Sequence, residues 1–250
     1  MRRFELAISL LMFALTACSS RGTDPLTMLP QDAEAWFALA PLETSGGHLG
    51  RVLSRLPDGA GLADLMRSVT GIDVMDPARS RESGLDPRRG ALLAVTTNKA
   101  LLVLPVSDTA LASRRLGLRL ARLGLIEQED PKFNLRVFAR EESPDLLVAL
   151  RMTGGLALVG AGGADLQDWL ASLAPSAGGR AQFDAVVEEA GPQGADAVGL
   201  VRNARLVGLM IGFLKTRSEV PQEASRKLAL WSTLLGDLRW AMRFDEGIQA

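Results

Sequence analysis

The chain has 250 residues, of which 47% are hydrophobic and 23% charged, and its formal net charge is −1. This balance is typical of a globular protein and lacks the basic excess of a nucleic-acid-binding one. With one cysteine, one histidine and no tyrosine, the chain cannot form an internal disulfide and has few of the usual catalytic groups.

The first twenty residues have the pattern of a bacterial export signal. Arg2 and Arg3 precede an apolar run over 6–15 that is interrupted only by Ser9. A membrane span needs roughly 20 apolar residues, and this run has about half of that. The run is therefore better suited to a cleaved signal peptide than to a membrane-spanning helix.

The only cysteine of the chain follows this apolar run directly. Residues 15–18, Leu-Thr-Ala-Cys, resemble the lipobox of bacterial lipoproteins. The resemblance implies cleavage before Cys18 and a thioether-linked diacylglycerol on its sulfur. In that protein class Ser19, rather than Asp, after the cysteine implies an outer-membrane location facing the periplasm.

The rest of the chain reads as an α+β body that begins near Leu29. Apolar runs bounded by turn residues predict strands, at 35–39, 91–96, 100–106, 134–139, 146–152, 156–160, 195–201 and 237–244. Apolar residues at helical spacing predict helices, at 48–56, 62–69, 109–123, 166–173, 183–188, 204–214 and 221–235. The segment 72–90 reads as a loop. Hairpins alternate with helical pairs, which favours a mostly antiparallel sheet with helical pairs packed on it.

The expected organisation is a signal peptide at 1–17, a lipidated tether at 18–28, a first α+β unit at 29–190 and a shorter unit at 191–250. Residues 30–39 align with 192–201 at a constant offset of 162 positions, and both stretches lead into an apolar strand. Each strand is followed by two predicted helices and then another strand. We therefore expect two related strand–helix–helix–strand units, with the second packed on the first and their sheets either joined or side by side.

Three patterns in the sequence have residue types that could support chemistry. The glycine-rich turn at 160–165 lies between a strand and a helix, but Asp165 at the helix start would repel a phosphate, so a tight turn with Asp165 as N-cap is favoured. Asp73, Asp76 and Asp86 share one loop, but ordinary Asp-Pro turns explain them better than calcium does. His48 has no partner nucleophile in the sequence. We expect no catalytic residue, no metal and no cofactor.

Two further segments have alternative interpretations. Arg114, Arg115, Arg119 and Arg122 form a basic helix face that could meet anionic lipid, but nearby acidic residues at 127–130 favour a solvated face. The segment 204–214 is apolar nearly all round and favours a buried helix. Its alternative role is to line a groove for a hydrophobic ligand, with the lining residues Leu206, Met210, Phe213 and Leu214.

The body also resembles a known family. The stretch Leu29-Pro30-x-Asp32-Ala33 before a strand, and Gly84-Leu85-Asp86-Pro87 before a hairpin, are similar to a family of uncharacterised bacterial envelope domains of unknown function. This resemblance covers about the first half of the body and implies no activity.

Taken together, the sequence predicts a lipid-anchored, periplasm-facing envelope protein with a non-enzymatic interaction or scaffold role. The alternative is a carrier or binder of a lipid or another hydrophobic small molecule. The expected partners are the membrane, through Cys18, and a lipid or an envelope protein, with no nucleic acid.

Overall fold

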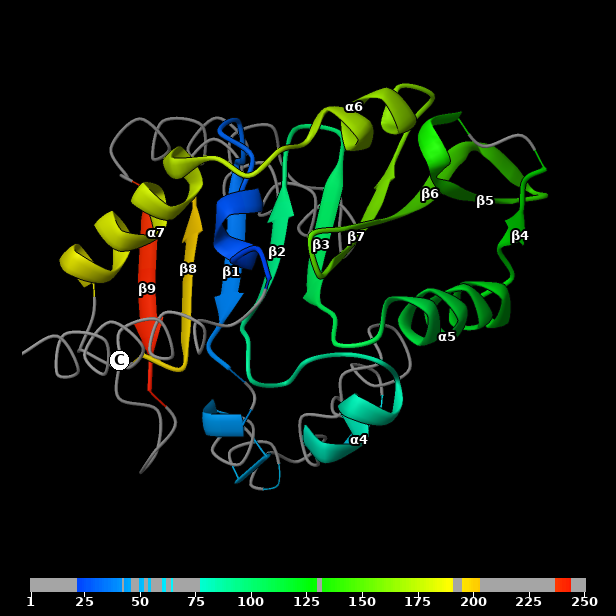
Figure 1. Ribbon diagram of the computed structural model, residues 1–250. Coiled ribbons are helices and arrows are strands. Elements are labelled where there is room, and N and C mark those ends of the chain that lie inside the picture. Colours follow the sequence, from blue (N-terminus) through cyan, green and yellow to red (C-terminus); the bar gives the residue numbers. More distant parts are fainter. Residues whose placement is uncertain are drawn as a thin grey trace, which may run out of the picture.

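A computed structural model of the chain is shown in Figure 1. The residues that the structure describes are 22–41, 43–45, 50, 51, 54, 60, 61, 64, 77–129, 132–190, 195–202 and 237–243. The helices predicted at 204–214 and 221–235 lie outside these residues, as does most of those predicted at 48–56 and 62–69. The isolated described residues 50, 51, 54 and 64 are helical.

The centre of the fold is one nine-stranded sheet in which every described strand pair is antiparallel. The strand order across the sheet is β4-β5-β6-β7-β3-β2-β1-β8-β9 (Figure 1). The strands are β1 Ala35–Leu39, β2 Ala91–Val95, β3 Ala100–Pro105, β4 Ile126–Glu127, β5 Arg136–Arg140, β6 Ser143–Thr153, β7 Leu156–Gly162, β8 Ala197–Val201 and β9 Leu238–Met242. This architecture confirms the predicted α+β class.

Short and long helices connect and cover the strands. They are the 3-10 turns η1 Pro25–Met28 and η2 Lys132–Asn134, and the helices α4 Pro77–Glu82, α5 Thr109–Arg122, α6 Leu166–Ser172 and α7 Ala177–Ala190. Four of them differ from the sequence prediction. α4 lies in a predicted loop, α7 is a full helix where the sequence predicts only a short turn at 183–188, and η1 lies in the predicted tether. η2 ends at Asn134, where the sequence predicts the start of a strand.

The two faces of the sheet are covered by different helices. Alternate residues of β3 belong to different cores: Leu101 and Val103 pack with residues of η1, α6 and α7, whereas Leu104 packs with α5. This follows from the period of two in a strand, which points successive side chains to opposite faces. In Figure 1, α7 and η1 lie over β9, β8 and β1, while α5 lies toward the opposite end of the sheet, below β4.

Both ends of α5 are fixed by local sequence. The Asp108 carboxylate accepts a hydrogen bond from the Leu111 N–H at 2.9 Å, as an N-cap does. At the other end, Gly124 has φ +78°, and the Leu125 N–H reaches back to the Leu120 carbonyl at 3.1 Å. This is the Schellman arrangement that a glycine permits. These local signals explain why the prediction of a helix over 109–123 is confirmed.

The two predicted units share one sheet. β8 pairs with β1, so the C-terminal strands extend the sheet that the N-terminal strands begin. No boundary between two sheets separates 29–190 from the described strands of 191–250. The segment after the lipobox also differs from the expected tether up to residue 28, because Met28 is 2% exposed and belongs to the core.

Candidate functional site

The sequence-predicted site residues are only partly within the described structure. Cys18, His48, Asp73 and Asp76 lie outside the described residues, as do the proposed lining residues Leu206, Met210, Phe213 and Leu214. Asp86 is described and pairs with Arg88 at 3.0 Å. The arginines of the basic helix are all described, on α5.

Asp165 occupies the predicted N-cap position of α6, but its side chain makes no capping hydrogen bond. The carboxylate instead pairs with the Lys99 ammonium at 2.7 Å. The hydrogen bond from Lys99 lowers the pKa of Asp165. The Lys99 ammonium also lies 5.7 Å from the centre of the Trp169 ring. An ion pair therefore joins the glycine-rich turn to the β2–β3 connection.

The segment that follows the predicted anchor is bound to the folded body from Thr23 onward. The Thr23 N–H donates to the Gly154 carbonyl at 2.9 Å, in the β6–β7 turn. The Arg89 guanidinium donates to the Thr23 carbonyl, and to the Gly155 carbonyl at 3.1 Å. Half-burial of this guanidinium lowers the pKa of Arg89. We name this cluster of Thr23, Arg89, Gly154 and Gly155 the entry clamp.

A second set of contacts fixes the next turn. The Asp24 carboxylate caps η1 by accepting from the Leu26 N–H at 3.0 Å, and it pairs with Arg180 of α7 at 2.9 Å. Arg180 also pairs with Asp184, one helical turn further along α7, at 3.0 Å. The chain between Thr23 and Met28 is therefore part of the folded body.

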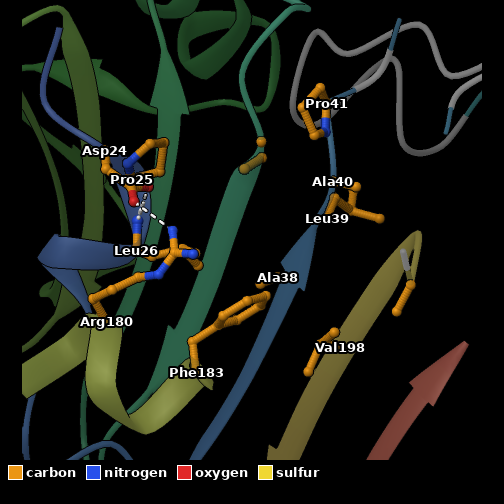
Figure 2. A pocket seen from close by; sticks show the side chains of 13 residues that line it. Asp24, Pro25, Leu26, Ala38, Leu39, Ala40, Pro41, Arg180, Phe183 and Val198 are labelled. Carbon is orange, nitrogen blue, oxygen red and sulfur yellow. Dashed lines mark hydrogen bonds and ion pairs between the residues drawn. The ribbon is translucent and has the colours of Figure 1, made fainter. Parts of the chain in front are cut away.

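A pocket of about 290 Å³ lies between η1, α7 and the ends of β1, β2 and β8. Figure 2 shows the Phe183 ring reaching toward Ala38 of β1, with Val198 on β8. The Arg180–Asp24 pair lies at the same pocket, where dashed lines mark its contacts (Figure 2). Small side chains along β1 and β2 leave this space because they do not fill the layer under α7. The pocket is at the lower end of the size range of small-molecule sites.

The exposed side of α5 combines arginines with an apolar residue. Leu118 is 49% exposed, and Arg114, Arg115 and Arg122 are exposed around it at helical neighbour positions. An open groove of about 530 Å³ runs beside Leu118 toward Phe138 of β5. Arg119 is half-buried, and this burial lowers the pKa of its guanidinium. The positive charges of Arg115 and Arg122 lower the same pKa further.

A structural ion pair lies in the same groove. Two Arg136 nitrogens meet the Glu127 carboxylate at 2.6 and 2.7 Å, and a third contact runs to the Ser113 carbonyl at 2.7 Å. The hydrogen bond from Arg136 lowers the pKa of Glu127. Glu127 is thus engaged by β5 rather than by the arginines on the exposed side of α5.

Among the residues that the structure describes, no group of three or more His, Cys, Asp or Glu residues could hold a metal ion. Within the same residues, no helix has both the length and the apolar character needed to cross a membrane.

The entry clamp and the Arg180–Asp24 pair were not recognised from the sequence. The two Arg89 contacts join residues separated by 66 positions, and the Arg180–Asp24 contact spans 156. No local pattern reports a pairing at such separation. The only available signal was the position of Asp24 before Pro25, which is a helix-start pattern as well as a turn pattern.

No protein-family model matches the chain, and neither does any curated protein. Two solved structures are similar to it, described as crystal form IV and crystal form I of TP0453. The first is 12% identical with a TM-score of 0.39, and the match covers 72% of this chain and 65% of that one. The second is 13% identical with a TM-score of 0.36, covering 74% and 63%. The matches thus span less than two thirds of those chains, and a similarity this distant indicates no function.

Proposed function

We propose that the protein is a lipid-anchored envelope protein, held to the membrane through Cys18, with a non-enzymatic interaction or scaffold role in the periplasm. The observation that carries this proposal is the entry clamp. Only residues 19–22 separate Cys18 from the clamped Thr23. An extended chain covers at most about 3.3–3.6 Å per residue, so Thr23 stays within roughly 17 Å of the lipidated cysteine.

A tether this short gives the body a defined side toward the membrane. The Gly155 carbonyl that receives Arg89 also receives the Val106 N–H at 2.9 Å, shortly before α5 begins. The side of the body that contains the clamp and the start of α5 therefore lies next to the membrane. The opposite parts of the sheet are left to face envelope partners.

A non-enzymatic role agrees with the origin of the perturbed pKa values. The lowered pKa values of Glu127 and Asp165 come from hydrogen bonds to Arg136 and Lys99, in ion pairs at the protein surface. The lowered pKa values of Arg89 and Arg119 come first from burial. These are structural contacts, whereas catalytic groups are usually tuned within one shared cleft.

The anchor is tested by expressing the full chain in a bacterial envelope, unchanged and as Cys18→Ala. The unchanged protein should yield an N-terminal peptide whose mass carries a diacylglycerol on Cys18, and should partition into detergent. Cys18→Ala should remain as an unprocessed precursor or as soluble protein. Ser20→Ala, which leaves the lipobox intact, is the control. An unmodified Cys18 in the mature unchanged protein would contradict the proposal.

The pocket under α7 supports the alternative role as a binder of a hydrophobic small molecule. It is lined mainly by apolar side chains, including Leu26, Phe183 and Val198. The residues that follow the clamped Thr23 in the chain form part of its wall. Native mass spectrometry of the purified protein should then detect a lipid, and Ala38→Leu, which fills the pocket, should remove it. If both proteins are free of ligand, the scaffold role is favoured.

A further inference from the structure

We propose that the exposed side of α5, centred on Leu118 and its three flanking arginines, docks on the anionic headgroups of the membrane that carries the Cys18 anchor. This inference rests on the proposed membrane attachment and adds the surface through which the body contacts the lipid. The surface consists of Arg114, Arg115, Leu118 and Arg122, and we name it the α5 face.

The charges of the α5 face are available to a partner. Within the described part of the chain, none of Arg114, Arg115 and Arg122 forms an ion pair. The nearest candidate from the sequence, Glu127, is held in a two-point contact by Arg136. The arginines therefore keep an uncompensated positive charge, which complements anionic lipid.

The α5 face as a whole has the composition of a helix that lies in the membrane interface. Such helices combine arginine or lysine with leucine or an aromatic residue, and long basic side chains extend to the headgroups while apolar ones enter the acyl boundary. Leu118 is about half exposed, between Arg114 and Arg122 along one line of the helix. The groove beside it adds exposed apolar surface from Ala110 and Ala121.

The tether places this face within reach of the bilayer. α5 begins beside the entry clamp, and its 14 residues span roughly 21 Å. The tether itself reaches roughly 17 Å. The other end of α5 is less suitable, because Glu141 and Glu142 lie near Leu123 and Ile126. The contact is accordingly centred on Leu118.

A fluorescent label separates this docking from the lipid anchor. In the full chain with Cys18→Ala, no native cysteine remains, so Leu118→Cys can carry an environment-sensitive dye. The matched control is Leu238→Cys, because Leu238 on the far strand β9 is 46% exposed. Both proteins retain the same signal segment, so any membrane binding by that segment is equal. Each is mixed with vesicles of phosphatidylglycerol or of phosphatidylcholine.

Docking predicts that the dye at position 118 shifts to shorter wavelength on phosphatidylglycerol vesicles, and that the dye at position 238 does not. Removing two charges with Arg115→Gln and Arg122→Gln should raise the lipid needed for half of the shift by roughly five-fold for each arginine. Arg202→Gln with Arg239→Gln, which removes two charges near β8 and β9, should leave it unchanged.

Three results would overturn the proposal. They are equal shifts at positions 118 and 238, an equal shift on phosphatidylcholine, and no shift at position 118, which would leave the α5 face to a protein partner. Because every sample lacks Cys18, these results are independent of lipidation. The anchor can thus fail its own test while docking holds, and docking can fail while the anchor holds.

Discussion

Phe37 of β1 lies directly opposite Gly199 of β8, the residue 162 positions later in the chain. The offset between these two partners equals the offset that aligns residues 30–39 with 192–201 in the sequence. A residue that pairs with its own sequence equivalent marks an approximate two-fold axis between two antiparallel strands. The axis therefore passes through the Phe37–Gly199 pair.

The neighbouring strands follow the same symmetry. Ala35 pairs with Val95 of β2, and its sequence equivalent Ala197 pairs with Met242 of β9. At the other end, Leu39 pairs with Ala91 and its equivalent Val201 pairs with Leu238. The strand register thus agrees with the predicted duplication. The helices at 48–70 and 204–235, which the duplication also requires, lie mostly outside the described residues, so it stays a prediction.

The symmetry is broken at the axis itself, where Gly199 accommodates an aromatic ring. The Trp240 ring lies 5.4 Å from the Phe37 ring, centre to centre, and a Cβ at position 199 would overlap the Trp240 indole. Gly199→Ala should therefore destabilise the fold by about 1–3 kcal/mol through overpacking. Denaturant unfolding checks this. Gly163→Ala, with no atom near its added Cβ, should change stability by less than about 0.5 kcal/mol.

Gly84 and Gly124 allow the cost of a positive φ to be separated from the cost of a clash. Gly84 has φ +80°, and its added Cβ would lie 2.6 Å from the Ala112 nitrogen and 2.7 Å from the Asp108 carbonyl. Gly124 has φ +78° with open space around it. Gly124→Ala should cost about 1–2 kcal/mol from the left-handed conformation alone. Gly84→Ala should cost more, because rigid backbone at the start of α5 must also move. Equal unfolding midpoints for the two variants would contradict this account.

Arg89→Ala should loosen the entry clamp. It removes the charged donor to the half-buried Thr23 and Gly155 carbonyls, and hydrogen bonds from a charged group contribute about 1.5–3 kcal/mol. Hydrogen exchange at the Thr23 amide and proteolysis within 19–28 should both become faster. Arg88→Ala, which removes an exposed side chain that donates a hydrogen bond to Asp86, is the control. Protection at Thr23 that is unchanged in Arg89→Ala would show that the clamp does not depend on Arg89.

The Glu127–Arg136 pair predicts a dependence of stability on pH. The pKa of Glu127 is lowered in the folded state, so its carboxylate stabilises the fold at pH above the ordinary glutamate range. That stabilisation is lost as the pH falls through the lowered pKa. Both side chains are about one third or more exposed, which limits the effect to roughly 1 kcal/mol or less. Glu127→Gln should therefore unfold more readily than the unchanged protein at neutral pH, and the difference should vanish in acid.

Some features could be predicted because their causes are local in the sequence. α5 follows from its capping aspartate, its apolar stripe and Gly124, and the β2–β3 hairpin follows from two apolar runs joined by a short polar turn. α4 was missed because an Asp-Pro pair was interpreted as a turn, although Pro77 is also favoured at the first position of a helix. The ion pair of Asp165 was not predicted, because its partner Lys99 lies on another strand connection.

The sequence by itself determined the lipobox expectation, the α+β class and most of the described strands, because apolar spacing and turn residues act over a few positions. Only the tertiary structure decided which strands are neighbours, that the C-terminal strands join the same sheet as β1, and that Arg89 and Arg180 hold the start of the body. It also decided that Glu127 is engaged by Arg136 rather than by the arginines of the α5 face, which form no ion pair with any residue that the structure describes. Apart from the Glu127–Arg136 pair, which spans nine positions, these contacts join residues far apart in the chain, and their partners are selected by packing of the whole sheet rather than by local sequence.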